Sequence, residues 1–125
     1  QVAEVSVGPD KAIRVHRVWC AIDCGLAVNP AGIRQQLEGA VVFGLSAALH
    51  GGVDIVDGQV QQSNFHDQPL IRLTDAPRVE CLIMPATDHP EGVGEPGLPP
   101  IAPAVANALF ALTGQRLRSL PLKLA

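Results

Sequence analysis

The chain has 125 residues, a formal net charge of −3 and nine scattered Lys and Arg residues. This charge balance argues against nucleic-acid binding, which needs a basic patch. Hydrophobic residues make up 47% of the chain and charged residues 17%, so we expect a packed core and not a disordered chain. The longest apolar stretches, residues 40–49 and 101–112, are too short to span a bilayer.

The first predicted element is a strand over residues 12–22, where β-branched side chains alternate with polar ones. Asp23–Gly25 follows as a turn. Asn29 is then placed to cap a helix, and Pro30 suits its first position, where the missing N–H costs nothing. Apolar residues recur at helical spacing up to Gly51, which predicts the end of this helix.

This first helix is rich in small residues, among them Gly39, Ala40 and Gly44. A glycine inside a helix costs about 0.5 to 1 kcal/mol relative to alanine. Two such glycines therefore predict that a backbone or a ligand approaches the helix closely.

The second half predicts a hairpin, a strand and a second helix. Asp57 and Gly58 form a hairpin turn signal between residues 53–56 and 59–63. Residues 78–84 form a strand apolar enough for a sheet interior. A last helix begins at Pro99 or Pro100, ends at Gly114 and is apolar on all sides, so we expect it to be buried. The fold class expected is α+β: one domain, 1–125, with a small sheet of mostly antiparallel strands and two packed helices.

Three cysteines, an odd number, argue against a disulfide framework. Cys20 and Cys24 have the spacing of half a zinc site, yet no second pair of ligands follows. We therefore expect Cys20, Cys24 and Cys81 to be reduced thiols, in the core in preference to a metal site.

The segment His89–Pro100, "HPEGVGEPGLPP", holds Glu95 among glycines and prolines. The glycines allow a bulky ligand to approach the backbone, and Pro96 stiffens the loop. The start of the following helix favours an ionised carboxylate by about 0.3 to 1 kcal/mol. These features make Glu95 a candidate base. The alternative is that the segment is an ordinary loop with a solvated glutamate.

The histidines offer weaker candidates. His66 and Asp67 form a possible acid/base pair, but neighbours on a strand point to opposite faces, which favours a structural or surface role. His16, His50 and His89 have no partner pattern.

Three segments together carry a resemblance to a known family: "AIDCGLAVNPAGIRQQLEGAVVFGLSAALHG", "QSNFHDQPL" and "GVGEPGLPPIAPAVANALFALTGQRLRSLPL". In this order they resemble the C-terminal end of the large, molybdenum-binding subunit of the xanthine dehydrogenase and aldehyde oxidoreductase family, in particular isoquinoline 1-oxidoreductase-like beta subunits. The resemblance covers residues 15–122, and three separated motifs are more specific than one glycine-rich loop.

The resemblance implies a mechanism and a set of site residues. Glu95 matches the glutamate of the family's "GEP" motif, which acts as base while oxygen from water is inserted into an N-heterocycle or aldehyde. Gln36 matches the glutamine that contacts the molybdopterin, and Gly94 lies in the same cofactor-binding motif as Glu95. The pterin holds the molybdenum, so no metal ligand is expected in the chain.

The resemblance also implies partners. The other cofactor-binding loops belong to the remainder of the large subunit, and the iron–sulfur clusters belong to a small subunit or another domain. The chain lacks an initiating Met, so we expect a C-terminal fragment that by itself neither retains cofactor tightly nor turns over substrate. Localisation, cytoplasmic or exported, is left open.

Two other hypotheses remain at this stage. One is a non-catalytic binding or assembly module with the same fold. The other is an unrelated small hydrolase that uses Glu95 with His66 or His89 and needs no molybdenum.

Overall fold

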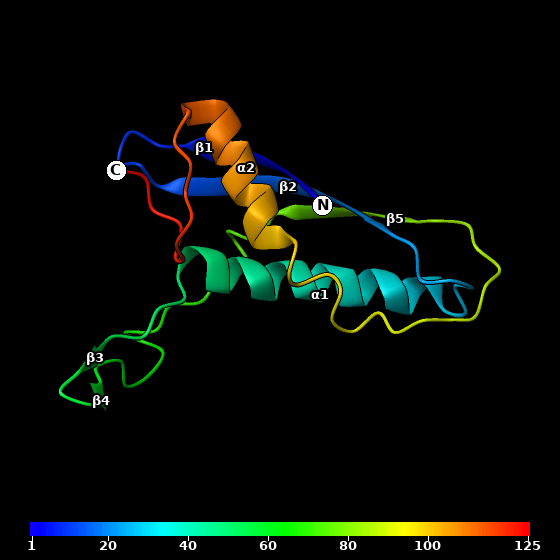
Figure 1. Ribbon diagram of the computed structural model, residues 1–125, viewed down its shortest axis with the longest axis horizontal. Coiled ribbons are helices and arrows are strands. Elements are labelled where there is room, and N and C mark those ends of the chain that lie inside the picture. Colours follow the sequence, from blue (N-terminus) through cyan, green and yellow to red (C-terminus); the bar gives the residue numbers. More distant parts are fainter.

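The computed structural model describes residues 1–125. The elements, in chain order, are β1 (Val2–Val7), β2 (Ile13–Ile22), α1 (Pro30–Leu49), β3 (Ile55–Val56), β4 (Gln59–Val60), β5 (Arg78–Ile83) and α2 (Ile101–Thr113). Figure 1 shows the two helices beside a three-stranded sheet, with the β3–β4 hairpin projecting away from them. The predicted α+β class is therefore confirmed.

The main sheet has the strand order β1-β2-β5. Strand β1 pairs with β2 in an antiparallel manner, with a register shift between Glu4 and Val5, whereas β5 pairs with β2 in parallel and without interruption. The parallel pair requires a long crossover, and α1 supplies it. The sheet is therefore mixed, and β1, which the sequence analysis did not predict, is one of its edges.

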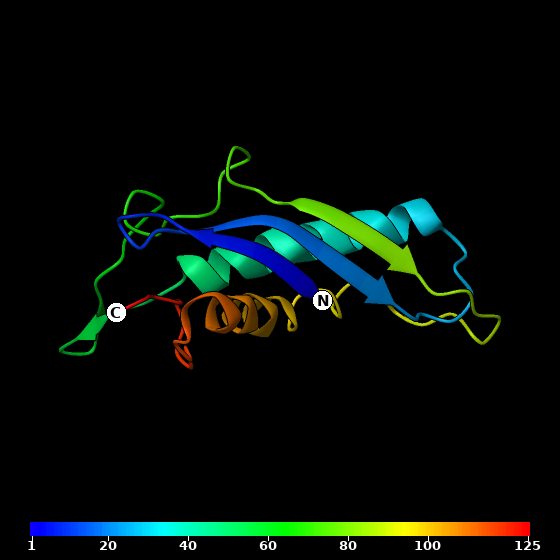
Figure 2. The same ribbon diagram turned by 90° about the horizontal axis from the view of Figure 1, so that it is seen from above.

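Strand β5 forms the other edge of the sheet, as Figure 2 shows. The expectation of an interior position was wrong for this chain, because no further strand follows β5 in the order. Its apolar composition is nevertheless that of an interior strand.

The core lies between one face of this sheet and the two helices. Its members are Leu122 and apolar residues of β2, of the turn after β2, of α1 and of α2: Val15, Val18, Cys20, Ile22, Cys24, Ile33, Leu37, Val41, Leu45, Ile101, Val105 and Leu109. Helix α1 packs against β2 and β5, and α2 packs against β1 and α1. Gly44 allows the helices to meet, because a Cβ there would contact Ile101 Cγ2 and lie 3.2 Å from the Leu98 carbonyl oxygen.

The start of α1 and the end of α2 lie where they were predicted. The Asn29 side chain accepts a hydrogen bond from the Gly32 N–H at 3.1 Å, and Pro30 is the first residue of α1. Helix α2 begins one residue after Pro100 and ends at Gly114, whose φ of 75° is left-handed. Glycine adopts this left-handed conformation without steric cost, whereas a residue with a Cβ atom is strained there.

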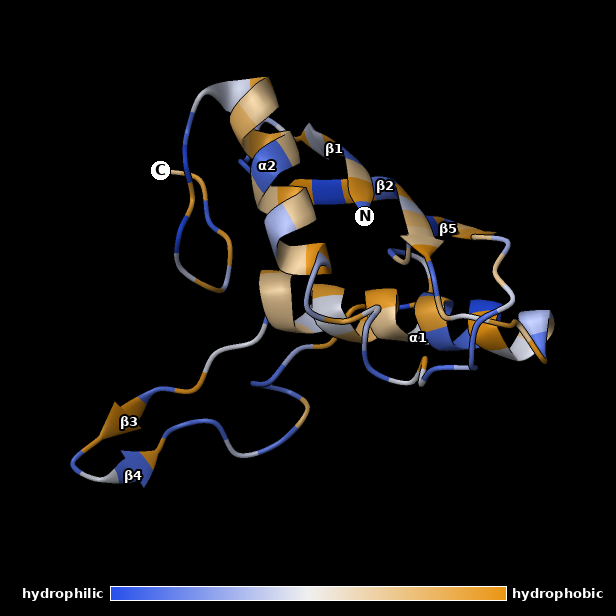
Figure 3. Ribbon diagram, turned by 45° about the vertical axis from the view of Figure 1, so that its right-hand side comes forward, coloured by the Kyte–Doolittle hydropathy of each residue, from blue (hydrophilic) through white to orange (hydrophobic).

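The expectation that α2 is buried on all sides was wrong. Only Ile101, Val105 and Leu109 are buried, and these lie at four-residue spacing along one face. Apolar colours dominate α2 in Figure 3, yet Phe110 and Leu112 are exposed. No helix or strand of the chain covers this second face, and the Arg116 guanidinium lies over the Phe110 ring, 3.6 Å from its centroid.

The β3–β4 hairpin has the predicted turn, with positive φ at Asp57 and Gly58. Its strands are exposed, including Ile55, Val56 and Val60. The segment that follows returns to the body of the protein at Ile71, whose N–H donates to Ser46 Oγ on α1 at 3.2 Å. Neither helix has the length and apolar character needed to cross a bilayer.

Candidate functional site

A pocket of about 530 Å³ lies between α1 and the loop that leads into α2. Its lining consists of Gln36, Gly39, Ala40, Phe43, Gly94, Glu95, Leu98 and Pro99. Gln36, Gly94 and Glu95, the three site residues implied by the resemblance, are therefore brought together in one hollow. Gln36 lies on α1, far in the sequence from Gly94 and Glu95, and the fold alone makes it their neighbour.

One wall of the pocket is a face of α1. Gln36, Ala40 and Phe43 are spaced by four and three residues, which places them on the same side of a helix. A Cβ added at Gly39 would meet no atom within 4 Å. The helix thus offers open backbone next to a carboxamide at Gln36 and an exposed aromatic ring at Phe43.

The opposite wall is the loop around Glu95, and hydrogen bonds anchor it on both sides. Upstream, the Glu91 N–H donates to the Cys24 carbonyl at 2.9 Å. Downstream, the Leu98 N–H donates to the Glu95 carbonyl at 3.0 Å, and Gln1 Nε2 donates to the Gly97 carbonyl at 2.7 Å. The backbone that carries Glu95 is therefore held in place although it lacks regular structure.

Gly94 and Gly97 of this loop differ in their surroundings. A Cβ at Gly97 would lie 2.8 Å from Ala40 Cβ and 3.1 Å from Leu37 Cδ2, so Gly97 lets the loop pack directly on α1. A Cβ at Gly94 would meet nothing within 4 Å. Gly94 therefore keeps the pocket open, and packing within this chain does not require it.

The Glu95 side chain is exposed at the pocket. The three ion pairs of the chain are Arg17 with Glu80, Arg78 with Glu80, and His66 with Asp67, so Glu95 has no ionic partner. Its carboxylate is thus available to a ligand or to a proton in the pocket. Gln36 is exposed in the same way.

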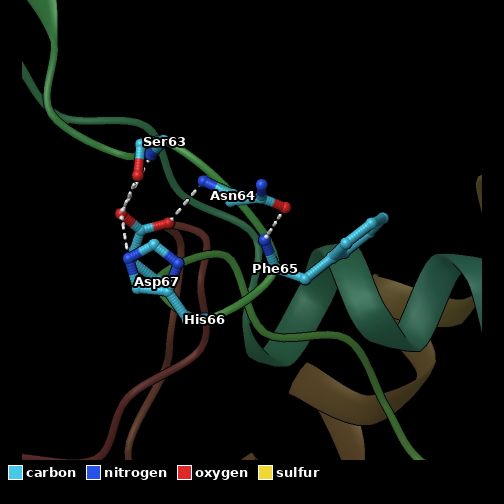
Figure 4. Close-up of polar contacts among 5 residues, drawn as sticks. All are labelled: Ser63, Asn64, Phe65, His66 and Asp67. Atoms are coloured by element: carbon cyan, nitrogen blue, oxygen red, sulfur yellow. Dashed lines mark hydrogen bonds and ion pairs between the residues drawn. The ribbon is translucent and has the colours of Figure 1, made fainter.

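His66 and Asp67 lie in a turn and not on a strand, so the expected opposite orientation was wrong: His66 Nε2 and Asp67 Oδ2 are 3.4 Å apart. The Asp67 carboxylate accepts the backbone N–H groups of Ser63 and Asn64, each at 2.9 Å, and the Ser63 hydroxyl at 3.1 Å (Figure 4). The Asn64 and Ser63 N–H groups hold the pKa of Asp67 below its usual range. This geometry agrees with a structural role for Asp67, because its hydrogen bonds to Ser63 and Asn64 stabilise the turn.

The hydrolase hypothesis requires a histidine next to Glu95, and no histidine lines this pocket. Neither His66 nor His89 lines it, and His89 Nδ1 contacts the Pro90 carbonyl at 2.9 Å. Glu95 and a histidine therefore do not form an acid/base pair in this structure.

All three cysteines are free, and Cys20 and Cys24 are buried as expected, whereas Cys81 is half-buried. Burial, followed by the neighbouring Cys81 thiol, raises the pKa of Cys20 to about 11. No group of three or more His, Cys, Asp or Glu residues is placed to hold a metal ion.

Comparison with known proteins identifies the family. The family model described as "Molybdopterin cofactor-binding domain" matches residues 1–77, more than half of the chain. The chain belongs to this molybdopterin cofactor-binding family. The beta subunit of isoquinoline 1-oxidoreductase from Brevundimonas diminuta is 40% identical over 114 residues, which are 91% of this chain and 15% of that protein.

Two further relatives of this chain are informative. A protein of Gluconacetobacter polyoxogenes, named membrane-bound aldehyde dehydrogenase [pyrroloquinoline-quinone], is 34% identical over 98% of this chain and 16% of its own length. The crystal structure of quinoline 2-oxidoreductase from Pseudomonas putida 86 superposes with a TM-score of 0.81 at 24% identity, over 95% of this chain and 16% of that one. The last similarity shows the shared fold. The chain spans about one-sixth of the length of these proteins.

The residues that line the pocket leave room for a molybdopterin beside the backbone. Gly39 and Gly94 leave open backbone on opposite walls, which allows a flat group to lie close to both. Phe43 and Leu98 are pocket residues that the sequence analysis missed, although the spacing of seven residues between Gln36 and Phe43 places both on one helical face.

Proposed function

We propose that this chain is the C-terminal part of the large subunit of a molybdenum hydroxylase, which oxidises an N-heterocycle or an aldehyde and inserts oxygen from water. The observation that carries the proposal is the single pocket in which Gln36, Gly94 and Glu95 meet. The family and the names of the relatives, an isoquinoline oxidoreductase and an aldehyde dehydrogenase, support the reaction class.

In this proposal Glu95 is the catalytic base. When bound, the molybdenum cofactor supplies the redox centre that takes up the electrons of the oxidised substrate. A Glu95 carboxylate oxygen accepts the proton of the water-derived nucleophile, and the anchored loop fixes the position of that carboxylate. Because Glu95 has no ionic partner, it loses no such interaction when it takes the proton.

Gln36 and Gly94 hold the cofactor. The Gln36 carboxamide can both donate and accept hydrogen bonds, which suits the polar edge of a pterin. Gly94 contributes backbone without a side chain, so the group can approach the loop next to Glu95.

The proposal includes partners. The remainder of the large subunit completes the site, because a pocket open on this chain cannot enclose a cofactor and a substrate by itself. A small subunit or domain with iron–sulfur clusters receives the electrons. By itself the 125-residue chain neither retains the cofactor tightly nor turns over substrate.

The test compares Glu95→Gln and Gly94→Ala in the complete enzyme. Glu95→Gln keeps the shape of the side chain and removes the base, so we expect turnover to fall by about 100-fold or more with nearly normal molybdenum content. Gly94→Ala adds a methyl group into open space, so we expect a folded enzyme with reduced molybdenum and activity reduced in proportion.

Three outcomes would contradict the proposal. Retained turnover in Glu95→Gln removes Glu95 from the mechanism and favours the non-catalytic module. Unchanged molybdenum in Gly94→Ala removes that residue from the cofactor site. An active parent enzyme without molybdenum points instead to a group such as pyrroloquinoline quinone, which is part of the name of one relative.

A further inference from the structure

Strand β5 has an open edge in this chain. The Met84 N–H donates to the Ile22 carbonyl at 2.8 Å, which shows the side on which β2 lies. Successive residues of a strand turn their N–H and C=O groups to opposite sides. The backbone N–H and C=O groups of Glu80 and Leu82 therefore also face β2. The backbone N–H and C=O groups of Val79, Cys81 and Ile83 face away from β2.

These outward groups have no hydrogen-bond partner within the chain, since β5 pairs with β2 alone. Natural sheets blunt an open edge with proline, lysine, a bulge or a short strand. Strand β5 has six residues, RVECLI, and its pairing with β2 has no bulge. The opposite edge differs, because β1 carries the register shift at Glu4 and Val5.

The charges of β5 do not protect its edge. Glu80 lies 3.4 Å from Arg78 and 3.6 Å from Arg17, so the acidic side chain is engaged within the sheet. Apolar side chains are exposed nearby instead: Leu82 is 60% and Met84 is 42% exposed. Strand β5 thus combines a paired acidic residue and exposed apolar side chains with an unpaired backbone edge.

We propose that a β-strand from another part of the same large subunit pairs with the free edge of β5 and extends the sheet. An extended backbone is the occupant that matches a row of alternating N–H and C=O groups. The chain spans 15% of its isoquinoline oxidoreductase relative, so most of such a subunit lies outside it. This inference rests on the proposed function only in taking the chain as part of a larger subunit.

Amide hydrogen exchange at single-residue resolution in the complete enzyme tests the proposal. We expect the outward amides of Val79, Cys81 and Ile83 to exchange as slowly as the amides of Glu80 and Leu82, which serve as internal controls. Exchange of the outward set on the order of 100-fold faster would show an open edge and overturn the proposal.

A cryo-electron microscopy map of the same enzyme identifies the occupant. A strand of the same subunit about 4.8 Å from β5 is the expected result. A strand from a second copy or from the small subunit, a helix, or solvent at this edge would overturn it. Neither measurement depends on turnover, so failure here leaves the Glu95→Gln test of the proposed function intact.

Discussion

Gly39 and Gly44 lie on the same helix but should respond in opposite ways to replacement by alanine. At an exposed helical position the change is favourable by about 0.5 to 1 kcal/mol. A Cβ at Gly39 meets nothing within 4 Å, so Gly39→Ala should raise the free energy of unfolding by that amount.

At Gly44 the same helical gain is opposed by a clash. The new Cβ would contact Ile101 Cγ2 and lie 3.2 Å from the Leu98 carbonyl oxygen, which belongs to backbone that cannot rotate away. Overpacking of a core typically costs about 1 to 3 kcal/mol. After the helical gain is subtracted, Gly44→Ala should lower the free energy of unfolding by about 0.5 to 2 kcal/mol.

Urea unfolding of the cofactor-free chain, followed by circular dichroism, measures both changes under identical conditions. Gly39→Ala is the matched control, since it carries the same chemical change on the same helix. The two variants should differ by about 1 to 3 kcal/mol. If Gly44→Ala stabilised the chain as much as Gly39→Ala does, the inference that Gly44 sets the approach of α1 and α2 would be refuted.

Two further predictions follow from shifted pKa values. Because N–H groups of Asn64 and Ser63 lower the pKa of Asp67, the stabilisation of this turn is present above the ordinary aspartate pKa and is lost as pH falls through the lowered value. The Ser63 and Asn64 amide signals should therefore titrate in NMR spectra with a midpoint below that ordinary pKa; a midpoint at or above it would contradict the geometry. Burial raises the pKa of Cys20, to about 11, and also that of Cys81, but Cys20 is buried whereas Cys81 is half-buried. Iodoacetamide at pH 8 should therefore modify Cys81 well before Cys20, as mass spectrometry of the alkylated peptides can measure. Equal rates in the folded chain would exclude a protected Cys20.

The elements predicted best from the sequence are those that depend on a few neighbouring residues. Asn29 and Pro30 start α1, Asp57 and Gly58 form the hairpin turn, and Gly114 ends α2, each as expected. These signals act through backbone preferences and short-range hydrogen bonds, which a sequence shows directly.

Other features depended on packing. Strand β1 was not predicted, and α2 is open on a side that its composition suggested was covered. Composition reports how apolar a segment is, but whether a neighbour covers it depends on the arrangement of the elements. The same reasoning applies to β5, whose apolar sequence predicts an interior strand and which lies at an edge of this sheet.

For the site, the sequence by itself offered Gln36, Gly94 and Glu95 as candidates, through motifs that resemble a known family. Only the tertiary structure decided that they line one pocket, that Phe43 joins them, and that Gly44 serves helix packing instead. The physical reason is distance along the chain. Contacts between α1 and the Glu95 loop form only when the sheet and both helices pack around one core, and no local preference of the backbone encodes them.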